Sequence, residues 1–263
     1  GDPCVEDYSP AQGYSDFGNN PRYLSDMTGA GLDDIVAFSD NGVIIAQASG
    51  TGFVDPDPGN FAIRRFGPNS GGWTEGAPRL LADVNGDGFE DIIGFGFTQT
   101  ALARARPDRT PPLFSNTATY DTLFVGPSWD VDENPRVIVD INNDGQDDVV
   151  AFSDNDVLLS PAIDREEAPN GALTPIGSVR TISGQFSIND GWQPLEDPRY
   201  FADVDGDGYV DLVGFGSLSP TEPGAVYYSL NPGQGGVFGT IREWVPEFSS
   251  NRGFTFDANP RFM

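Results

Sequence analysis

The sequence predicts an all-β fold, namely a β-propeller built from four-stranded antiparallel blades. A Pro-Arg pair recurs at intervals of 57, 57, 63 and 62 residues, and self-similarity at such a period is typical of propellers and solenoids. Between these pairs, short segments rich in Val, Ile, Phe and Tyr alternate with Gly, Pro and Asp, which is the pattern of antiparallel strands. No segment keeps the helical period over several turns. Four strands in each of four repeats match the blades of a propeller.

The Pro-Arg pairs divide the chain into repeats within one propeller domain. Residues 1–20 are expected to form an N-terminal segment or a closing strand, and residues 260–263 the start of a fifth repeat or a closing strand. The four blade repeats between them are residues 21–77, 78–134, 135–197 and 198–259. Two arrangements stay open for the ring. Either these four blades close it, or the chain is part of a larger ring, for example one that a homodimer completes or extends.

Each repeat has the same order of elements. A short apolar strand starts at the Pro-Arg pair, as in residues 79–82, and an acidic loop follows it. The second strands are apolar runs directly after the loop, at residues 35–38, 92–95, 149–152 and 212–215. The third strands are expected at residues 42–47, 100–105, 156–160 and 224–230. The fourth strands are expected after long polar stretches, at residues 61–66, 120–125, 178–182 and 240–244.

Oxygen-bearing side chains stand at alternate positions of the acidic loop, which reads DVNGDGFED from residue 83 in the second repeat. Ca²⁺ takes about 6–8 oxygen ligands, and alternate side chains of a tight loop supply them. A glycine allows the sharp turn that returns the last aspartate to the ion. We therefore predict about three structural Ca²⁺ sites, each with four side chains and one backbone carbonyl oxygen (Phe89, Gln146 or Tyr209). The predicted ligands are Asp83, Asn85, Asp87, Phe89 and Asp91; Asp140, Asn142, Asp144, Gln146 and Asp148; and Asp203, Asp205, Asp207, Tyr209 and Asp211.

Two other interpretations fit the same letters. An EF-hand needs flanking helices and a glutamate at its last position, whereas β-type sequence flanks these loops. The other alternative is a metal-free turn in which aspartates accept hydrogen bonds from backbone N–H groups. The loop from Asp26 to Asp34 favours that alternative, because Thr28 and Ala30 replace two of the ligands. A metal in the other loops is expected to be structural, since no nucleophile or general base lies beside them.

The composition argues against several classes of function. The chain has 40 acidic and 14 basic residues, and a net charge of −26 repels nucleic acids and anionic membranes. No apolar run reaches the roughly 18 residues of a membrane-spanning helix, so no membrane insertion is expected. Histidine is absent, which removes the commonest general base and argues against an enzyme. Cys4 is the single cysteine, so no internal disulfide can form, and its role stays open.

A tryptophan precedes three of the Pro-Arg pairs. The tryptophans are Trp73, Trp129 and Trp192, and the arginines that follow them are Arg79, Arg136 and Arg199. A flat indole is a usual platform for the apolar face of a sugar, and polar groups beside it fix the hydroxyls. The alternative is that these rings wedge between adjacent blades. Likewise, the arginines either hydrogen-bond a ligand or pair with a neighbouring carboxylate.

Together these motifs resemble a known family of repeats. The segments GGW…PRLLADVNGDGFEDIIGFG and DGW…PRYFADVDGDGYVDLVGFG resemble the Psathyrella velutina lectin family, and more distantly the FG-GAP/VCBS-type repeats of integrin α-subunits. The resemblance covers residues 13–263 and implies a propeller with Ca²⁺ in its acidic loops. It also implies N-acetylglucosamine or sialic acid sites between consecutive blades. The family commonly places a histidine before Pro-Arg, where this chain has Asn20, Ala77, Asn134, Asp197 and Asn259, and its members carry more repeats.

The expected function is that of a calcium-stabilised lectin with repeated glycan sites at the blade junctions, binding glycans or glycoproteins. Weak repeated sites gain strength through avidity. An integrin-like propeller that binds another protein without sugar is the alternative, and a propeller enzyme such as a polysaccharide lyase is a more distant one. Secretion is expected, with cytoplasmic storage, as in some fungal lectins, as the alternative location.

Overall fold

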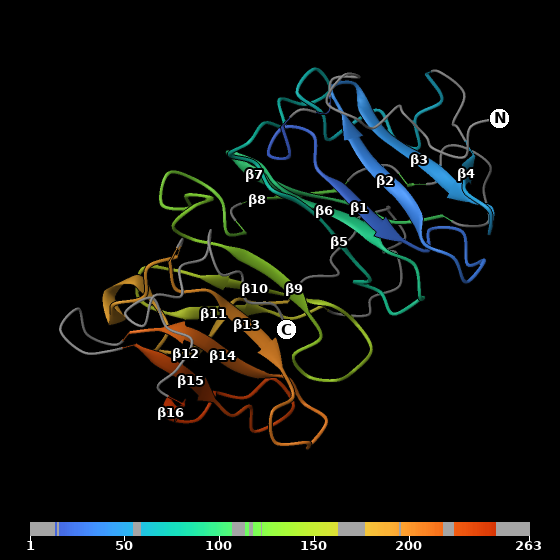
Figure 1. Ribbon diagram of the computed structural model, residues 1–263. Coiled ribbons are helices and arrows are strands. Elements are labelled where there is room, and N and C mark those ends of the chain that lie inside the picture. Colours follow the sequence, from blue (N-terminus) through green and yellow to red (C-terminus); the bar gives the residue numbers. More distant parts are fainter. Residues whose placement is uncertain are drawn as a thin grey trace. The chain divides into compact units, whose positions relative to one another are not determined.

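The computed structural model describes residue 14 and residues 16–54, 59–106, 114–115, 118–121, 123–162, 177–194, 196–217 and 224–245. In this part of the chain, the regular structure is β-sheet apart from one 3-10 turn, η3 (Ile188–Asp190). The strands form four four-stranded sheets, and the strands of each sheet lie in chain order (Figure 1). All neighbouring strands are antiparallel. The predicted all-β fold is confirmed. Cys4 and residues 260–263 lie outside the described residues.

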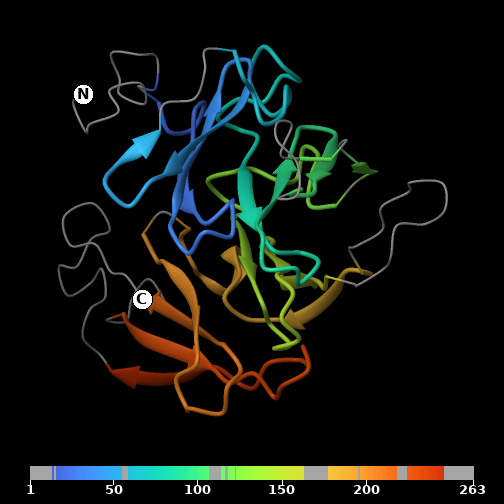
Figure 2. The same ribbon diagram turned by 90° about the vertical axis from the view of Figure 1, so that its right-hand side faces the viewer.

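Each repeat contributes one sheet, and each sheet begins at a Pro-Arg pair. The first sheet contains β1 (Arg22–Ser25), β2 (Asp34–Ser39), β3 (Gly42–Ala48) and β4 (Phe53–Val54). The second contains β5 (Arg79–Ala82), β6 (Asp91–Phe95), β7 (Gln99–Ala103) and β8 (Ala118–Asp121). The third contains β9 (Arg136–Val139), β10 (Asp148–Phe152), β11 (Val157–Ser160) and β12 (Arg180–Ser183). The fourth contains β13 (Arg199–Ala202), β14 (Asp211–Gly216), β15 (Ala225–Ser229) and β16 (Arg242–Val245), coloured orange to red in Figure 2.

The fourth strand of the first sheet differs from the expected segment. The strand is β4, whereas residues 61–66 make only an isolated bridge, in which Val43 pairs with Ile63. Phe66 explains the difference, because its φ of 66° is left-handed and cannot continue a strand. Its ring is fully buried instead. In the second sheet, β8 likewise ends before Phe124, which has a φ of 48°.

Two faces can be distinguished on every sheet, because alternate residues of a strand point to opposite sides. We call one side the Phe face, because it carries the phenylalanine of the second strand: Phe38, Phe95, Phe152 or Phe215. We call the other side the Gly/Ala face, because it carries the preceding residue: Ala37, Gly94, Ala151 or Gly214.

The chain divides into two compact units, with the main boundary between Ser128 and Trp129, and each unit has its own core. In both units the core lies where the Phe face of one sheet meets the Gly/Ala face of the next. The first core contains Val36, Phe38 and Ile45 from the first sheet and Ile92 and Ala101 from the second. The second contains Val150, Phe152 and Leu159 from the third sheet and Leu212 and Tyr227 from the fourth. None of the described helices could cross a membrane.

Candidate functional site

The acidic loops lie between the first and second strands of the four sheets, and their first aspartate organises the turn. Asp83 accepts hydrogen bonds from the backbone N–H groups of Gly86, Asp87 and Gly88 at 2.8–3.1 Å. Asp203 accepts from Gly206 at 2.6 Å and from Gly208 at 3.0 Å. The corresponding bonds of Asp140 and Asp26 have the same pattern. The loop conformation is therefore held by its own carboxylate in all four repeats.

The last aspartate of each loop is buried and connects the loop to the end of the third strand. Asp148 accepts from the N–H of Ile141 at 3.1 Å and from that of Ala162 at 2.7 Å. Asp211 accepts in the same way from Val204 at 3.0 Å and from Asn231 at 2.8 Å. Asp34 and Asp91 are also buried and accept from Ala48 and Ala105. This hydrogen bond to the third strand could not be predicted from the loop sequence, because its donor is a backbone N–H group, which every residue type except proline carries.

Each of the three complete loops holds oxygen atoms that fit a cation. In the second sheet, Oδ2 of Asp91 is buried and accepts no hydrogen bond from the described residues. In the third sheet, Oδ1 of Asn142 and Oε1 of Gln146 are also buried and accept no hydrogen bond from the described residues. In the fourth sheet, ligand oxygens of Asp203, Asp205 and Asp211 all lie within 4.8 Å of one another. Carboxylate and amide oxygens are the ligands that Ca²⁺ prefers, so the residues present fit this ion.

The other predicted ligands lie at the same steps of the three loops. Asp87, Asp144 and Asp207 are exposed, and each accepts a hydrogen bond from the N–H group two residues later at 2.9–3.0 Å. Those N–H groups belong to Phe89, Gln146 and Tyr209, the residues whose carbonyl oxygens are predicted ligands. Asn85 donates to Asp87 at 3.0 Å, so the two side chains already lie side by side.

Burial makes the last aspartates weak acids in the absence of a cation. Burial, and secondarily the neighbouring carboxylates Asp87 and Asp83, raise the pKa of Asp91 to about 8, against the effect of the Ala105 hydrogen bond. Burial also raises the pKa of Asp148 to about 7, and it raises the pKa of Asp34 and Asp211. An ionised carboxylate in such a place is unfavourable unless a positive charge compensates it.

Two of the three predicted tryptophan platforms lie in the cores. Trp73 is 3% exposed and Trp192 is 0% exposed. Trp192 stacks on Phe186 with ring centroids 4.8 Å apart, and Trp73 packs on Phe66 at 5.0 Å. Neither ring therefore offers an open face in this structure, and the geometry favours the alternative role of packing.

Glycine makes room for these two indoles. A Cβ atom on Gly94 would lie 2.6 Å from the Trp73 ring, and one on Gly214 would lie 2.3 Å from the Trp192 ring. The even repeats therefore carry Gly at this position, whereas the odd repeats carry Ala37 and Ala151. This close approach explains an alternation that is visible in the sequence.

The predicted arginines bind backbone carbonyl groups. Arg199 donates to the carbonyl oxygen of Phe186 at 2.8 Å, and Arg79 donates to those of Trp73 at 3.0 Å and Phe66 at 3.4 Å. Phe186 has a φ of 67° and, like Phe66, is held in the left-handed region that is costly for a bulky residue. The arginines thus fix a strained turn. Burial lowers the pKa of Arg79, Arg136 and Arg199 to about 10, so all three stay charged at neutral pH.

Trp129 is the predicted platform that keeps exposed surface. Its side chain is half-buried, and the guanidinium of Arg136 lies 5.9 Å from its ring centroid. Arg136 donates to the carbonyl oxygens of Asp130 at 3.1 Å and Asn134 at 2.7 Å. Asn134 stands where the resembled family has histidine, and it donates to the Phe152 carbonyl and to Asp154. Asn20 makes the equivalent bonds in the first repeat.

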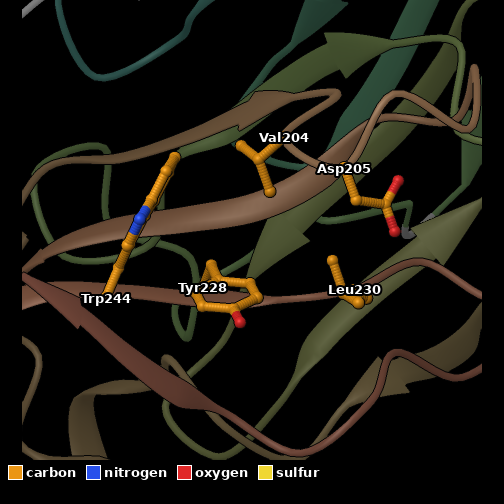
Figure 3. Close-up of a pocket in the computed structure, with 5 residues that line it drawn as sticks. All are labelled: Val204, Asp205, Tyr228, Leu230 and Trp244. Atoms are coloured by element: carbon orange, nitrogen blue, oxygen red, sulfur yellow. The ribbon is translucent and has the colours of Figure 1, made fainter.

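The structure also contains a pocket that the sequence analysis missed. It has a volume of about 220 Å³ and is lined by Val204, Asp205, Tyr228, Leu230 and Trp244. Trp244 stands at one end and Asp205 at the other (Figure 3). The Trp244 side chain is 55% exposed, and its ring packs edge-on against Tyr228 at 5.8 Å. The available sequence signal was Trp244, at the end of the predicted fourth strand at residues 240–244.

Comparison with solved structures shows that this chain is similar to a lectin. It superposes on an Agrocybe aegerita lectin, described as recognising non-reducing terminal N-acetylglucosamine, with a TM-score of 0.76 and 28% sequence identity. The match covers 90% of this chain and 55% of the lectin. A Photorhabdus luminescens Tc holotoxin pore matches 91% of this chain over 10% of its own, with a TM-score of 0.52 and 16% identity, and so shows the fold alone. No family model and no curated protein matches. The chain therefore has a lectin-like fold and spans about half the length of the lectin that it matches.

Proposed function

We propose that this protein is a carbohydrate-binding β-propeller, stabilised by Ca²⁺, without enzymatic activity. The similarity to the Agrocybe aegerita lectin over 90% of this chain carries the proposal. The four antiparallel sheets, each starting at a Pro-Arg pair, support blades of a propeller. The proposed ligand is a glycan that ends in N-acetylglucosamine. With a net charge of −26, we expect the protein to bind a neutral sugar more readily than a sialoside.

Structural Ca²⁺ is the second part of the proposal. Asp83 to Asp91, Asp140 to Asp148 and Asp203 to Asp211 would each hold one ion, through the side chains and carbonyl groups predicted from the sequence. The unpartnered oxygen of Asp91 and the grouped carboxylates of Asp203, Asp205 and Asp211 support this role. A bound cation compensates the negative charge of the carboxylates that the fold buries.

The Trp129 ring is the proposed sugar platform of the second unit. It alone among the three predicted tryptophans is only half-buried, and Arg136 holds the turn in which it lies. An aromatic face of this kind packs against the C–H groups of a pyranose ring. The acidic residues Asp130 and Glu133 are exposed near it in the chain and provide acceptors for sugar hydroxyl groups.

We expect methyl β-N-acetylglucosaminide to bind the wild-type protein weakly in isothermal titration, in a buffer with Ca²⁺. Trp129→Ala is expected to weaken binding about 10-fold or more at that site, because stacking on an aromatic ring is lost, whereas Trp129→Phe keeps most of it. Phe97→Ala is the control, because Phe97 is 60% exposed and lies on another repeat.

Two results would contradict different parts of the proposal. If Trp129→Ala binds the sugar with unchanged affinity and stoichiometry, Trp129 is not part of a sugar site, but the protein can still be a lectin. Absence of binding to any amino sugar, sialoside or fucoside on a glycan array would exclude the lectin function. Binding of a protein ligand that free sugars do not displace would then favour the integrin-like alternative.

A further inference from the structure

The acidic loop of the second repeat contains an Asn-Gly pair, Asn85–Gly86. Asparagine is deamidated most readily before glycine, because glycine carries no Cβ atom that would hinder attack by its backbone nitrogen. Of the two other such pairs in the sequence, Asn170–Gly171 lies outside the described residues. In the other pair, Asn41–Gly42, the glycine is buried, and a Cβ atom on it would lie 2.4 Å from a backbone carbonyl oxygen. Gly86 is exposed instead, so the chain has room to rearrange there during a reaction.

Hydrogen bonds around Asn85 place a base and a hydrogen-bond donor at the groups that react in deamidation. The N–H of Gly86 donates to Oδ1 of Asp83 at 2.8 Å, so a carboxylate lies at the proton that the nitrogen must lose. The N–H of Asp87 donates to Oδ1 of Asn85 at 3.0 Å, and this oxygen gains negative charge during the attack. Nδ2 of Asn85 donates to Asp87 at 3.0 Å, which holds the amide group in place. A base and a donor at such positions are what general acid–base and electrostatic catalysis require.

The third loop provides an internal comparison, because it carries an asparagine at the same step without these features. Asn142 corresponds to Asn85, but Asn143 follows it in place of glycine, and a side chain there hinders attack by the backbone nitrogen. Oδ1 of Asn142 is buried and accepts no hydrogen bond from the described residues. We therefore expect Asn142 to persist under conditions in which Asn85 reacts.

We propose that Asn85 undergoes spontaneous deamidation, and that an ion bound in its loop protects it. The nitrogen of Gly86 loses its proton and forms a bond to Cγ of Asn85, while the bond from Cγ to Nδ2 breaks. The electron pair of the broken bond stays on Nδ2, which takes up the proton and leaves as ammonia. The product is a five-membered succinimide ring, and water then opens it at one of its two carbonyl carbons. Water is the only other reactant.

Opening of the ring gives one of two products. If water breaks the bond between Cγ and the nitrogen, residue 85 becomes an ordinary aspartate. If it breaks the backbone bond, the chain continues through Cγ as isoaspartate. The fourth loop shows that aspartate fits this step, because Asp205 accepts from the N–H of Asp207 at 3.1 Å as Asn85 accepts from that of Asp87. Isoaspartate adds a methylene group to the backbone and so changes the spacing of the oxygen atoms in the loop.

Protection by Ca²⁺ rests on the proposed function, whereas deamidation itself does not. The side chains of Asn85 and Asp83 are both predicted ligands of the ion, and Ca²⁺ is bound through such oxygen atoms. A carboxylate that binds the ion is no longer available as a base. An amide that binds it cannot turn onto the nitrogen of Gly86. The ion-free protein is therefore the form that we expect to react.

The test is prolonged incubation of the folded protein in EDTA and in excess Ca²⁺, followed by peptide mass spectrometry. In EDTA, we expect Asn85 to be converted to the acid about 10-fold faster than Asn142, or more. Excess Ca²⁺ is expected to slow the reaction of Asn85 about 10-fold or more, because little ion-free protein remains. Persistence of Asn85 in EDTA would overturn the proposal. Equal rates in EDTA and Ca²⁺ would overturn protection alone if Ca²⁺ still raises the melting temperature, and would overturn it together with the proposed Ca²⁺ sites if it does not.

The variant Asn143→Gly separates the effect of glycine from that of the hydrogen bonds. It creates an Asn-Gly pair in the third loop, at a position whose φ of 56° suits glycine. Asn142 is then expected to react, but about 10-fold more slowly than Asn85, because its Oδ1 accepts no hydrogen bond from the described residues. An equal rate would overturn the part of the proposal that assigns a role to Asp83 and Asp87.

The variant Asn85→Asp reproduces the ordinary product alone and measures what isoaspartate does to the loop. It is expected to keep its response to Ca²⁺ in calorimetry, since the fourth loop carries Asp205 at this step. The acidic fraction of the incubated wild type contains both products and is expected to respond less, in proportion to its isoaspartate content by peptide analysis. A full response in that fraction would overturn the inference that isoaspartate disrupts the loop.

Discussion

Chelation of Ca²⁺ is expected to lower the melting temperature of this protein strongly. Ligand at 100 times its dissociation constant stabilises a fold by about 2.7 kcal/mol for each site. For a chain of this size, that corresponds to about 5–10 °C for each occupied loop. Without the ion, burial raises the pKa of Asp91 to about 8 and that of Asp148 to about 7, so keeping either carboxylate ionised in the fold is unfavourable. Differential scanning calorimetry in EDTA and in excess Ca²⁺ measures the difference.

The chain itself supplies the matched variant for this experiment. Asp205 corresponds to Asn85 and Asn142 in the other two complete loops. Asp205→Asn is therefore expected to keep most of the response to Ca²⁺, whereas Asp205→Ala removes a ligand and part of the response. Coincident melting curves in EDTA and Ca²⁺ would show that the loops are empty turns. A full response to Ca²⁺ in Asp205→Ala would exclude Asp205 from the ion's ligands.

Trp192→Ala is expected to destabilise the second unit by about 3–5 kcal/mol, because it leaves a large cavity in a closely packed core. The indole is fully buried, stacks on Phe186 and meets the Tyr227 ring edge-on at 5.9 Å. Trp129→Ala removes the same side chain from a half-buried position and is expected to cost much less. Urea unfolding of the two variants, followed by far-ultraviolet circular dichroism, gives the comparison.

Gly214→Ala tests the same contact from the other side. Its Cβ atom would lie 2.3 Å from the Trp192 ring, so overpacking of about 1–3 kcal/mol or more is expected. The double variant Trp192→Ala, Gly214→Ala should lose less stability than the sum of the two single changes, since the added methyl group enters the space that the indole leaves. Strict additivity would mean that the two residues do not share a packing site.

Much of the fold could be predicted because the sequence repeats its local signals. Pro-Arg, the acidic loop and the apolar run after it stand at a constant spacing, and each copy folds into the first two strands of a sheet. The bounds of the fourth strands were predicted less accurately, because apolar residues beside them pack in the core without being part of a strand. Phe66 belongs to the segment predicted as a strand, but its backbone is left-handed and cannot continue one. Its ring packs against Trp73 instead.

The tryptophans show why site residues are harder to predict than strands. A tryptophan that binds a sugar and a tryptophan that packs in the core stand at the same place in the repeat. What distinguishes them is whether the indole ring faces solvent or the neighbouring sheet. Gly94 and Gly214 carried that information, since a glycine inside a buried strand signals the close approach of another group. The arginines are similar, because their acceptors are backbone carbonyl groups, which no side-chain pattern reveals.

The alternation of Gly94 and Gly214 with Ala37 and Ala151 has a consequence for how the protein unfolds. An indole from one repeat reaches onto the next sheet at Trp73 in the first unit and at Trp192 in the second, so in each unit two sheets share one core. In a repeat array, stability divides into contributions from modules and from their junctions. The module of this chain is consequently a doublet of about 120 residues, not the single Pro-Arg repeat. Amide hydrogen exchange should therefore resolve two protection levels, one for each doublet, rather than four.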